Sequence, residues 1–123
     1  QVEEHRVDAE DFDFPEATAA LLNATRAADG RVVAVGTTAT RVLETQYLDG
    51  RFRSGAGQTK LFIHPPYRFR MVDALMTNFH LQKTTLLVLV CTFGGRELLL
   101  RAYHEAIAEE YRFFSYGDAM LIV

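Results

Sequence analysis

The sequence is poor in cysteine, in long apolar runs and in basic charge, and each shortage excludes a class of protein. Cys91 is the only cysteine among the 123 residues, so we predict neither an internal disulfide nor a metal centre. The longest apolar stretch, around residues 86–90, is far shorter than the roughly 20 residues that span a bilayer. The first residues also lack the basic and then apolar order of a secretory signal. We therefore expect a cytoplasmic domain that does not contact a membrane.

The charge is slightly acidic overall and uneven along the chain. The formal net charge is −3 at pH 7, whereas a domain that binds nucleic acid by itself usually has a basic excess. Acids dominate residues 1–16, while residues 51–70 contain arginine and lysine but no acid. The basic segment is either a solvated hairpin or a source of a few phosphate contacts within a larger surface.

Strand and helix patterns alternate along the chain, without an internal repeat. With 49% hydrophobic and 24% charged residues, the chain fits one compact domain with a core. The alternation predicts an α/β fold with a mainly parallel sheet flanked by helices on both faces, in three layers. In the first half of the chain we predict an extended lead-in over 2–14, a helix over 15–29, a strand over 31–35, a helix over 36–45 and a loop or ragged hairpin over 49–57. Asp13 is expected to cap the first helix and Gly30 to stop it. In the second half we predict strands over 60–63 and 72–78, helices over 84–93 and 96–111, and a strand over 118–123.

The turn Gly36-Thr37-Thr38 joins a buried strand to a helix. In α/β sheets, ligands collect at this carboxyl edge, where the amides of a helix start can hold a carboxylate or a phosphate. The alternative is a plain turn with a threonine cap. Arg41, on the following helix, either reaches such a ligand or pairs with Glu44.

Two kinds of side chain are candidates for proton transfer. His80 follows Asn78 and Phe79 at a strand end, and a histidine there can exchange a proton near neutral pH. The alternative is a histidine that only forms structural hydrogen bonds. For Asp73 and Asp118, desolvation beside aromatic rings would raise the pKa, as a general acid or base requires.

The run from Tyr111 to Met120 places four aromatic rings beside Arg112 and Asp118. Rings of this kind offer flat apolar faces to a base or a sulfonium, and the two charges need partners if they are buried. The run therefore forms either the floor of a site or a closing segment whose rings fill the core.

Three blocks of sequence resemble one enzyme family. GTTATRVLE (Gly36 to Glu44), VDALMTNFHL (Val72 to Leu81) and YRFFSYGDAMLI (Tyr111 to Ile122) are similar, in this order, to the C-terminal part of the S-adenosylmethionine:tRNA ribosyltransferase-isomerases of queuosine synthesis. The likeness runs over nearly the whole chain. It implies a larger two-domain enzyme whose N-terminal portion and β-barrel domain lie outside these residues.

The resemblance implies that the complete enzyme transfers and isomerises the ribosyl group of S-adenosylmethionine onto 7-aminomethyl-7-deazaguanine in tRNA. The product is epoxyqueuosine, and adenine and methionine are released. S-adenosylmethionine is then a co-substrate, no further cofactor is expected, and we expect a monomer that is inactive when reduced to this fragment. The candidate residues are His80, Asp118 and Asp73 for proton transfer, and Gly36, Thr37, Thr38, Arg41, Asn78, Phe79, Arg112, Phe113 and Tyr116 for substrate binding.

Three positions depart from the family pattern. Pro66 stands where a glycine is expected, Gln82 stands where a proline is expected, and Asp8 stands where the family has a second histidine. If that histidine serves the reaction, this chain is a divergent relative with altered chemistry. A non-catalytic anion-binding or nucleotide-binding module is the other alternative, and His5 and Glu10 remain additional site candidates.

Overall fold

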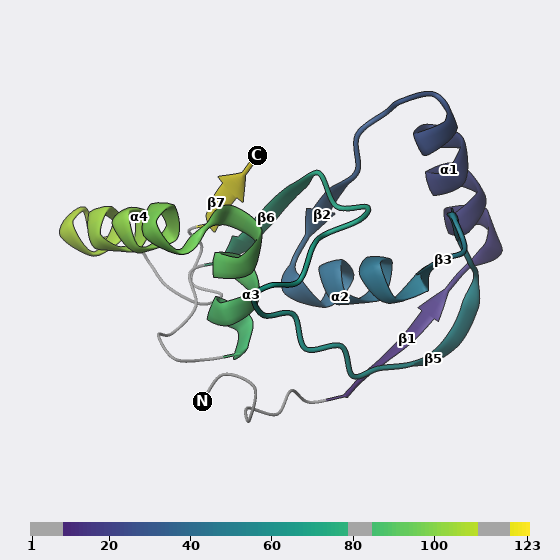
Figure 1. Cartoon of the computed structure of the whole chain (residues 1–123), viewed down its shortest axis with the longest axis horizontal. Coiled ribbons are helices and arrows are strands. Elements are labelled where there is room, and N and C mark those ends of the chain that lie inside the picture. Colours follow the sequence, from purple (N-terminus) through teal and green to yellow (C-terminus); the bar gives the residue numbers. More distant parts are fainter. Residues whose placement is uncertain (1–8, 79–84, 111–118) are drawn as a thin grey trace.

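The computed structural model describes residues 9–78, 85–110 and 119–123. A small central sheet with three helices packed on it lies beside a second group of short strands and one helix (Figure 1). In chain order the elements are β1 (Glu10–Phe14), α1 (Glu16–Ala27), β2 (Val33–Val35), α2 (Thr37–Gln46), β3 (Tyr47–Leu48), β4 (Arg51–Phe52), β5 (Gly55–Thr59), β6 (Ala74–Asn78), α3 (Thr85–Gly94), α4 (Arg96–Ala108) and β7 (Ala119–Ile122).

The central sheet has the strand order β2-β6-β7 and is mixed rather than mainly parallel. Strands β2 and β6 are parallel, as predicted, because the chain between them returns to the edge where β2 starts. Strand β7 is antiparallel to β6. Two successive helices, α3 and α4, lie between β6 and β7, so the chain comes back to the edge where β6 ends and β7 runs in the reverse direction.

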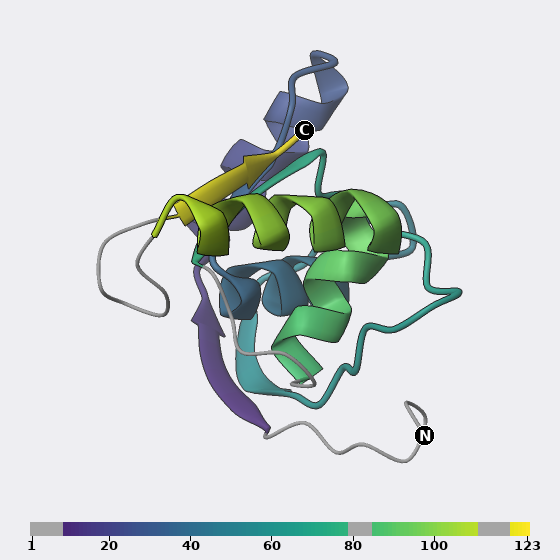
Figure 2. The ribbon, with the colours of Figure 1, turned by 90° about the vertical axis from the view of Figure 1, so that its left-hand side faces the viewer.

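Helices cover only one face of this sheet among the described residues. Ala34, Leu75 and Ile122 point into a core that side chains of α3 and α4 complete, and Leu43 of α2 packs against it. Figure 2 shows α4 and α3 lying together in front of α2. On the opposite face, Val33, Val35, Met76 and Leu121 are exposed to solvent, whereas the small Ala74 beside Val33 is buried. The predicted three-layer arrangement is therefore replaced by two layers in the described part of the chain.

A second, smaller core lies under α1. It is centred on Phe14, Ala19 and Phe52, and the Phe14 and Phe52 rings pack in a T-shaped arrangement with their centroids 6.3 Å apart. Strand β1 pairs with β5 and β3 pairs with β4, both antiparallel. Leu43 packs against both cores, so α2 connects the two parts of the fold.

The predicted helices are confirmed and several of the predicted boundaries are not. Helix α1 starts after Pro15 with no side-chain cap, so Asp13 is not the capping residue. Asp29, with a φ of 59°, adopts the left-handed conformation after α1, in place of Gly30. The strand predicted over 60–63 is replaced by β5, immediately upstream. In the described ranges, no helix combines the length and the apolarity needed to cross a bilayer.

Candidate functional site

The turn at Gly36 lies where the parallel strands β2 and β6 end. Gly36 has a φ of 97°, which favours glycine, and its amide donates a hydrogen bond to the carbonyl of Met76 at 2.8 Å, extending the ladder of β2 and β6. Helix α2 begins at the next residue without a side-chain cap. Thr37 is buried and Thr38 is exposed. The turn therefore presents the start of α2 and the Thr38 hydroxyl at the carboxyl edge, as the sequence predicted.

Asn78 lies at the same edge of the sheet. In the register of β2 and β6, Val35 is opposite Met76, so the residues after each strand continue side by side. The antiparallel register of β7 places Ala119 opposite Asn78. The described chain thus leaves the sheet at Asn78 and re-enters it at Ala119, at the same end of the strands as the Gly36 turn, with β6 lying between β2 and β7.

Arg41 is buried, with only 3% of its surface exposed, and its guanidinium is held by protein groups. Its Nε donates to the carbonyl of Leu61 at 3.0 Å, and its Nη2 donates to that of Thr59 at 3.4 Å. Its Nη1 lies 3.7 Å from Oε1 of Glu10, which also accepts the Thr38 hydroxyl at 3.3 Å. A carboxylate of the chain itself therefore sits beside the start of α2, and Glu10 joins the predicted site.

Asp73 lies at the opposite edge of the sheet, just before β6. Its Oδ2 accepts the amide of Val32 at 2.7 Å and is 2.9 Å from Nη1 of Arg26. Burial raises the pKa of Asp73, but the hydrogen bonds from Val32 and Arg26 and the arginine charge outweigh it, so that the pKa is lowered overall. The expected rise in its pKa is thus not found. These contacts are at the end of the sheet opposite to the Gly36 turn.

Glu44 is a residue whose environment the sequence did not reveal. Its side chain is fully buried. Oε1 accepts the Tyr67 hydroxyl at 2.7 Å and the Arg70 amide at 2.9 Å, while Oε2 accepts the amides of Met71 at 2.9 Å and Val72 at 3.2 Å. Burial, together with the hydrogen bond to Glu44, raises the pKa of the Tyr67 hydroxyl. Glu44 therefore fixes the segment before β6 rather than binding a ligand.

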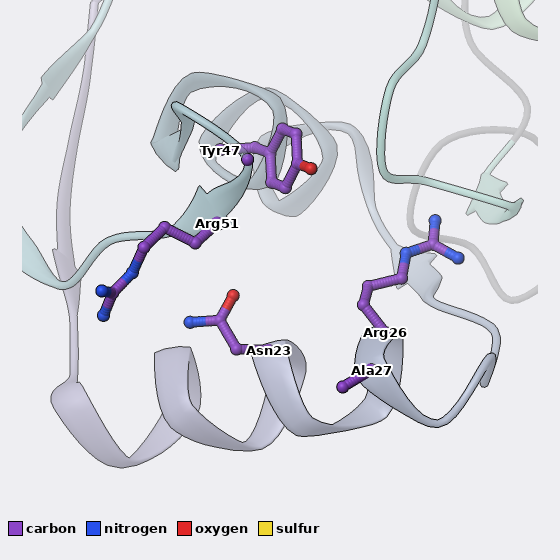
Figure 3. A pocket seen from close by; sticks show the side chains of 6 residues that line it. Asn23, Arg26, Ala27, Tyr47 and Arg51 are labelled. Carbon is purple, nitrogen blue, oxygen red and sulfur yellow. The ribbon is translucent and has the colours of Figure 1, made fainter.

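Two hollows lie away from the Gly36 turn. The first, of about 430 Å³, lies between α1 and the β3-β4 hairpin, where Asn23 and Arg26 face Tyr47 and Arg51 (Figure 3). The Asn23 side chain exchanges two hydrogen bonds with the backbone of Phe52, so its polar groups are already satisfied. The second, of about 340 Å³, is lined in part by Glu44 and Tyr67. Neither hollow includes the predicted site residues Gly36, Thr38 or Asn78.

The remaining candidates are outside the described ranges. They are His80, Asp118, Phe79, Arg112, Phe113 and Tyr116, together with His5 and the departures at Asp8 and Gln82. Within residues 9–78, 85–110 and 119–123, no three histidine, cysteine, aspartate or glutamate side chains are grouped so as to hold a metal ion.

Comparison with known proteins decides the family. The family model described as "Queuosine biosynthesis protein" matches residues 1–122. The chain belongs to this family. A curated S-adenosylmethionine:tRNA ribosyltransferase-isomerase from Geobacter metallireducens is 56% identical over 99% of the chain, and one from Anaeromyxobacter dehalogenans is 56% identical over 97%.

The chain spans about a third of the length of these family members, 36% and 34% respectively. A solved structure from the family, the S-adenosylmethionine tRNA ribosyltransferase from Thermotoga maritima, superimposes on 92% of the chain with a TM-score of 0.86 and 49% identity. The match takes up 40% of that structure. The mixed α/β fold described above is therefore the fold of the corresponding part of this relative.

Proposed function

We propose that the protein carrying this chain is an S-adenosylmethionine:tRNA ribosyltransferase-isomerase. The enzyme transfers and isomerises the ribosyl group of S-adenosylmethionine onto 7-aminomethyl-7-deazaguanine in tRNA, giving epoxyqueuosine and releasing adenine and methionine. The observation that carries this proposal is the family match to residues 1–122, with 56% identity to a relative of that name. We further propose that the enzyme is a cytoplasmic monomer, that S-adenosylmethionine is consumed as a co-substrate, and that no other cofactor takes part.

Within this chain, we place the substrate site at the edge where the Gly36 turn, Asn78 and Ala119 meet. The start of α2 favours a negatively charged group because its first amides lack partners within the helix. Glu10 lies beside the Thr38 hydroxyl there, which supports a site that accepts carboxylates. A methionine carboxylate or a phosphate would take the place of Glu10 and leave the buried Arg41 in its position.

The reaction requires proton transfer at two places. A base must remove the acidic proton beside the sulfonium, and an acid must assist the departure of adenine. We propose His80 and Asp118 for these roles and Phe79, Phe113 and Tyr116 as stacking surfaces, because the described chain leaves and re-enters the sheet at the end of the strands where the Gly36 turn lies. The contacts of Asp73 with Val32 and Arg26 favour a structural role for that residue.

The direct test uses the full-length protein with S-adenosylmethionine and tRNA that contains the precursor base. Release of adenine, detected by mass spectrometry, and the corresponding mass gain of the tRNA are expected. S-adenosylmethionine binding without adenine release would instead favour a non-catalytic nucleotide-binding module or a divergent relative.

The role of His80 is tested by replacing it with alanine. His104, exposed on α4, provides the matched control as His104→Ala. Adenine release should fall by about 100-fold or more in the first variant, as expected for a lost general acid or base, and stay unchanged in the second. Near-normal turnover of His80→Ala would remove this residue from the chemistry.

A further inference from the structure

Glu10, Thr38 and Arg41 form a small polar cluster between the start of β1 and the first turns of α2. Oε1 of Glu10 accepts the Thr38 hydroxyl at 3.3 Å and lies 3.7 Å from Nη1 of Arg41. The Arg41 side chain is only 3% exposed, whereas the Glu10 side chain is 41% exposed. The cluster therefore combines a buried positive charge with a carboxylate that solvent can reach.

The contact between Glu10 and Arg41 is a loose ion pair. Its N–O distance of 3.7 Å exceeds the roughly 2.7–2.9 Å of a hydrogen bond between charged groups. The carbonyls of Leu61 and Thr59 accept hydrogen bonds from Nε and Nη2 of Arg41, so these backbone groups hold the guanidinium whether or not Glu10 stays beside it. A partly exposed carboxylate in such a pair can turn away at little cost.

We propose that Glu10 makes this site specific for the zwitterionic end of an amino acid. The ligand's carboxylate takes the place of the Glu10 carboxylate beside Thr38 and Arg41, and Glu10 turns to accept a hydrogen bond from the ligand's α-ammonium group. The inference rests on the proposed function, because the methionine end of S-adenosylmethionine carries both groups. It selects an amino-acid carboxylate over a phosphate as the anion at the start of α2, and it gives Glu10 a role in binding.

The charges of the cluster favour this kind of ligand. Arg41 and Glu10 together carry no net charge, and a zwitterion adds one charge of each sign, so each charge of the ligand meets an opposite one. A phosphate brings no cationic group, and its negative charge would lie beside the carboxylate that it displaces. Repulsion of the wrong ligand is a common source of specificity. Glu10 should therefore disfavour phosphates as well as favour the amino-acid end of the substrate.

The test is a double-mutant cycle in the full-length protein between Glu10→Gln and the amino group of the substrate. Adenine release is measured with S-adenosylmethionine and with an analogue in which hydrogen replaces the amino group. The loss of this group should lower kcat/KM of the wild type by at least about tenfold, as for a hydrogen bond between charged groups, and that of Glu10→Gln by less than about threefold. The control is Asp11→Asn, an exposed neighbour that accepts a hydrogen bond from Gln58, and it should behave as the wild type.

Inorganic pyrophosphate provides an independent measurement as a competitor of S-adenosylmethionine. Its inhibition constant should fall by at least about threefold in Glu10→Gln and stay unchanged in Asp11→Asn. An unchanged constant in Glu10→Gln would contradict the proposed discrimination against phosphates.

The same assay separates the two levels of inference. If removal of the amino group lowers kcat/KM equally in the wild type and in Glu10→Gln, the role of Glu10 is overturned while the proposed reaction stands. If the wild type releases no adenine from S-adenosylmethionine in the presence of precursor tRNA, the proposed function fails, and the role of Glu10 fails with it.

Discussion

Replacing Glu44 with glutamine should destabilise the full-length protein by about 1–3 kcal/mol, the usual cost of leaving a buried hydrogen-bond donor without its acceptor. The carboxylate is fully buried and accepts four hydrogen bonds, three of them from the consecutive amides of Arg70, Met71 and Val72. Glutamine has almost the same shape, so the substitution changes hydrogen bonding and charge but not packing volume.

The magnitude follows from the two orientations of the new amide. With its NH₂ in the place of Oε2, it meets the Met71 and Val72 amides, and two buried donors lose their acceptor. With its NH₂ in the place of Oε1, it meets the Arg70 amide, while the Tyr67 hydroxyl can turn and accept. Each buried donor without a partner costs about 1–3 kcal/mol. The Arg70 guanidinium also loses its counter-charge, because its Nε lies 4.0 Å from Oε1 of Glu44.

Urea unfolding followed by far-ultraviolet circular dichroism measures the effect. With a slope of about 2 kcal/mol/M, a loss of about 2 kcal/mol lowers the midpoint by about 1 M. The control is Glu105→Gln at an exposed position on α4, where we expect a change within about 0.5 kcal/mol. If the two variants unfold at the same urea concentration, the hydrogen bonds to Glu44 do not hold the segment before β6 and our account of it is wrong.

Three further predictions concern stability and reactivity. Asp73→Asn should lower the unfolding free energy at pH 7. Because folding depresses the pKa of Asp73 below 3.8, the stability that its carboxylate contributes exists above about pH 4 and is lost as the pH falls. The urea midpoints of variant and wild type should therefore converge in acid. Gly94→Ala should lower the free energy of unfolding, measured by thermal unfolding, by about 1–3 kcal/mol, because a Cβ there overlaps the buried Leu99. Gly57→Ala is the control and should cost less, because a Cβ there makes only ordinary contacts. Equal losses of stability in the two variants would contradict this account. Because burial raises the pKa of the Cys91 thiol, with Arg96 lowering it only in part, native Cys91 should react with maleimide at pH 7.5 more slowly than an unfolded thiol; equal rates would refute this.

The helices and the turn at Gly36 could be predicted from the sequence because their signals are local. Apolar spacing, a glycine before α2 and the glycine pair between α3 and α4 act within a few residues. The direction of β7 could not be predicted in the same way, because it depends on how the α3 and α4 helices return the chain to the sheet. Residues 31–35 were predicted to form a buried strand because they are apolar on both faces, whereas Val33 and Val35 of β2 are exposed in the described part of the chain.

For the described site candidates, the end of the sheet at which a residue lies could be predicted in part, but its contacts could not. Gly36, Thr38 and Asn78 share the carboxyl edge of the sheet, as parallel strands require. Asp73 lies at the other edge, five residues before Asn78 along β6, and a sequence block alone does not separate the two ends of a strand. The role of Glu44 depends on backbone amides 26 to 28 residues away, and no spacing rule connects such positions.

Helix α2 has a consequence for how ligand binding spreads through this part of the protein. Its first turn lies at the edge where we propose the substrate site, Leu43 touches both cores, and Glu44 near its end accepts hydrogen bonds from the 70–72 backbone. Opening of either core therefore removes contacts made by this helix. A substrate seated on the first turn of α2 would therefore slow hydrogen exchange as far away as β4 and the 70–72 segment, and not only beside the bound molecule.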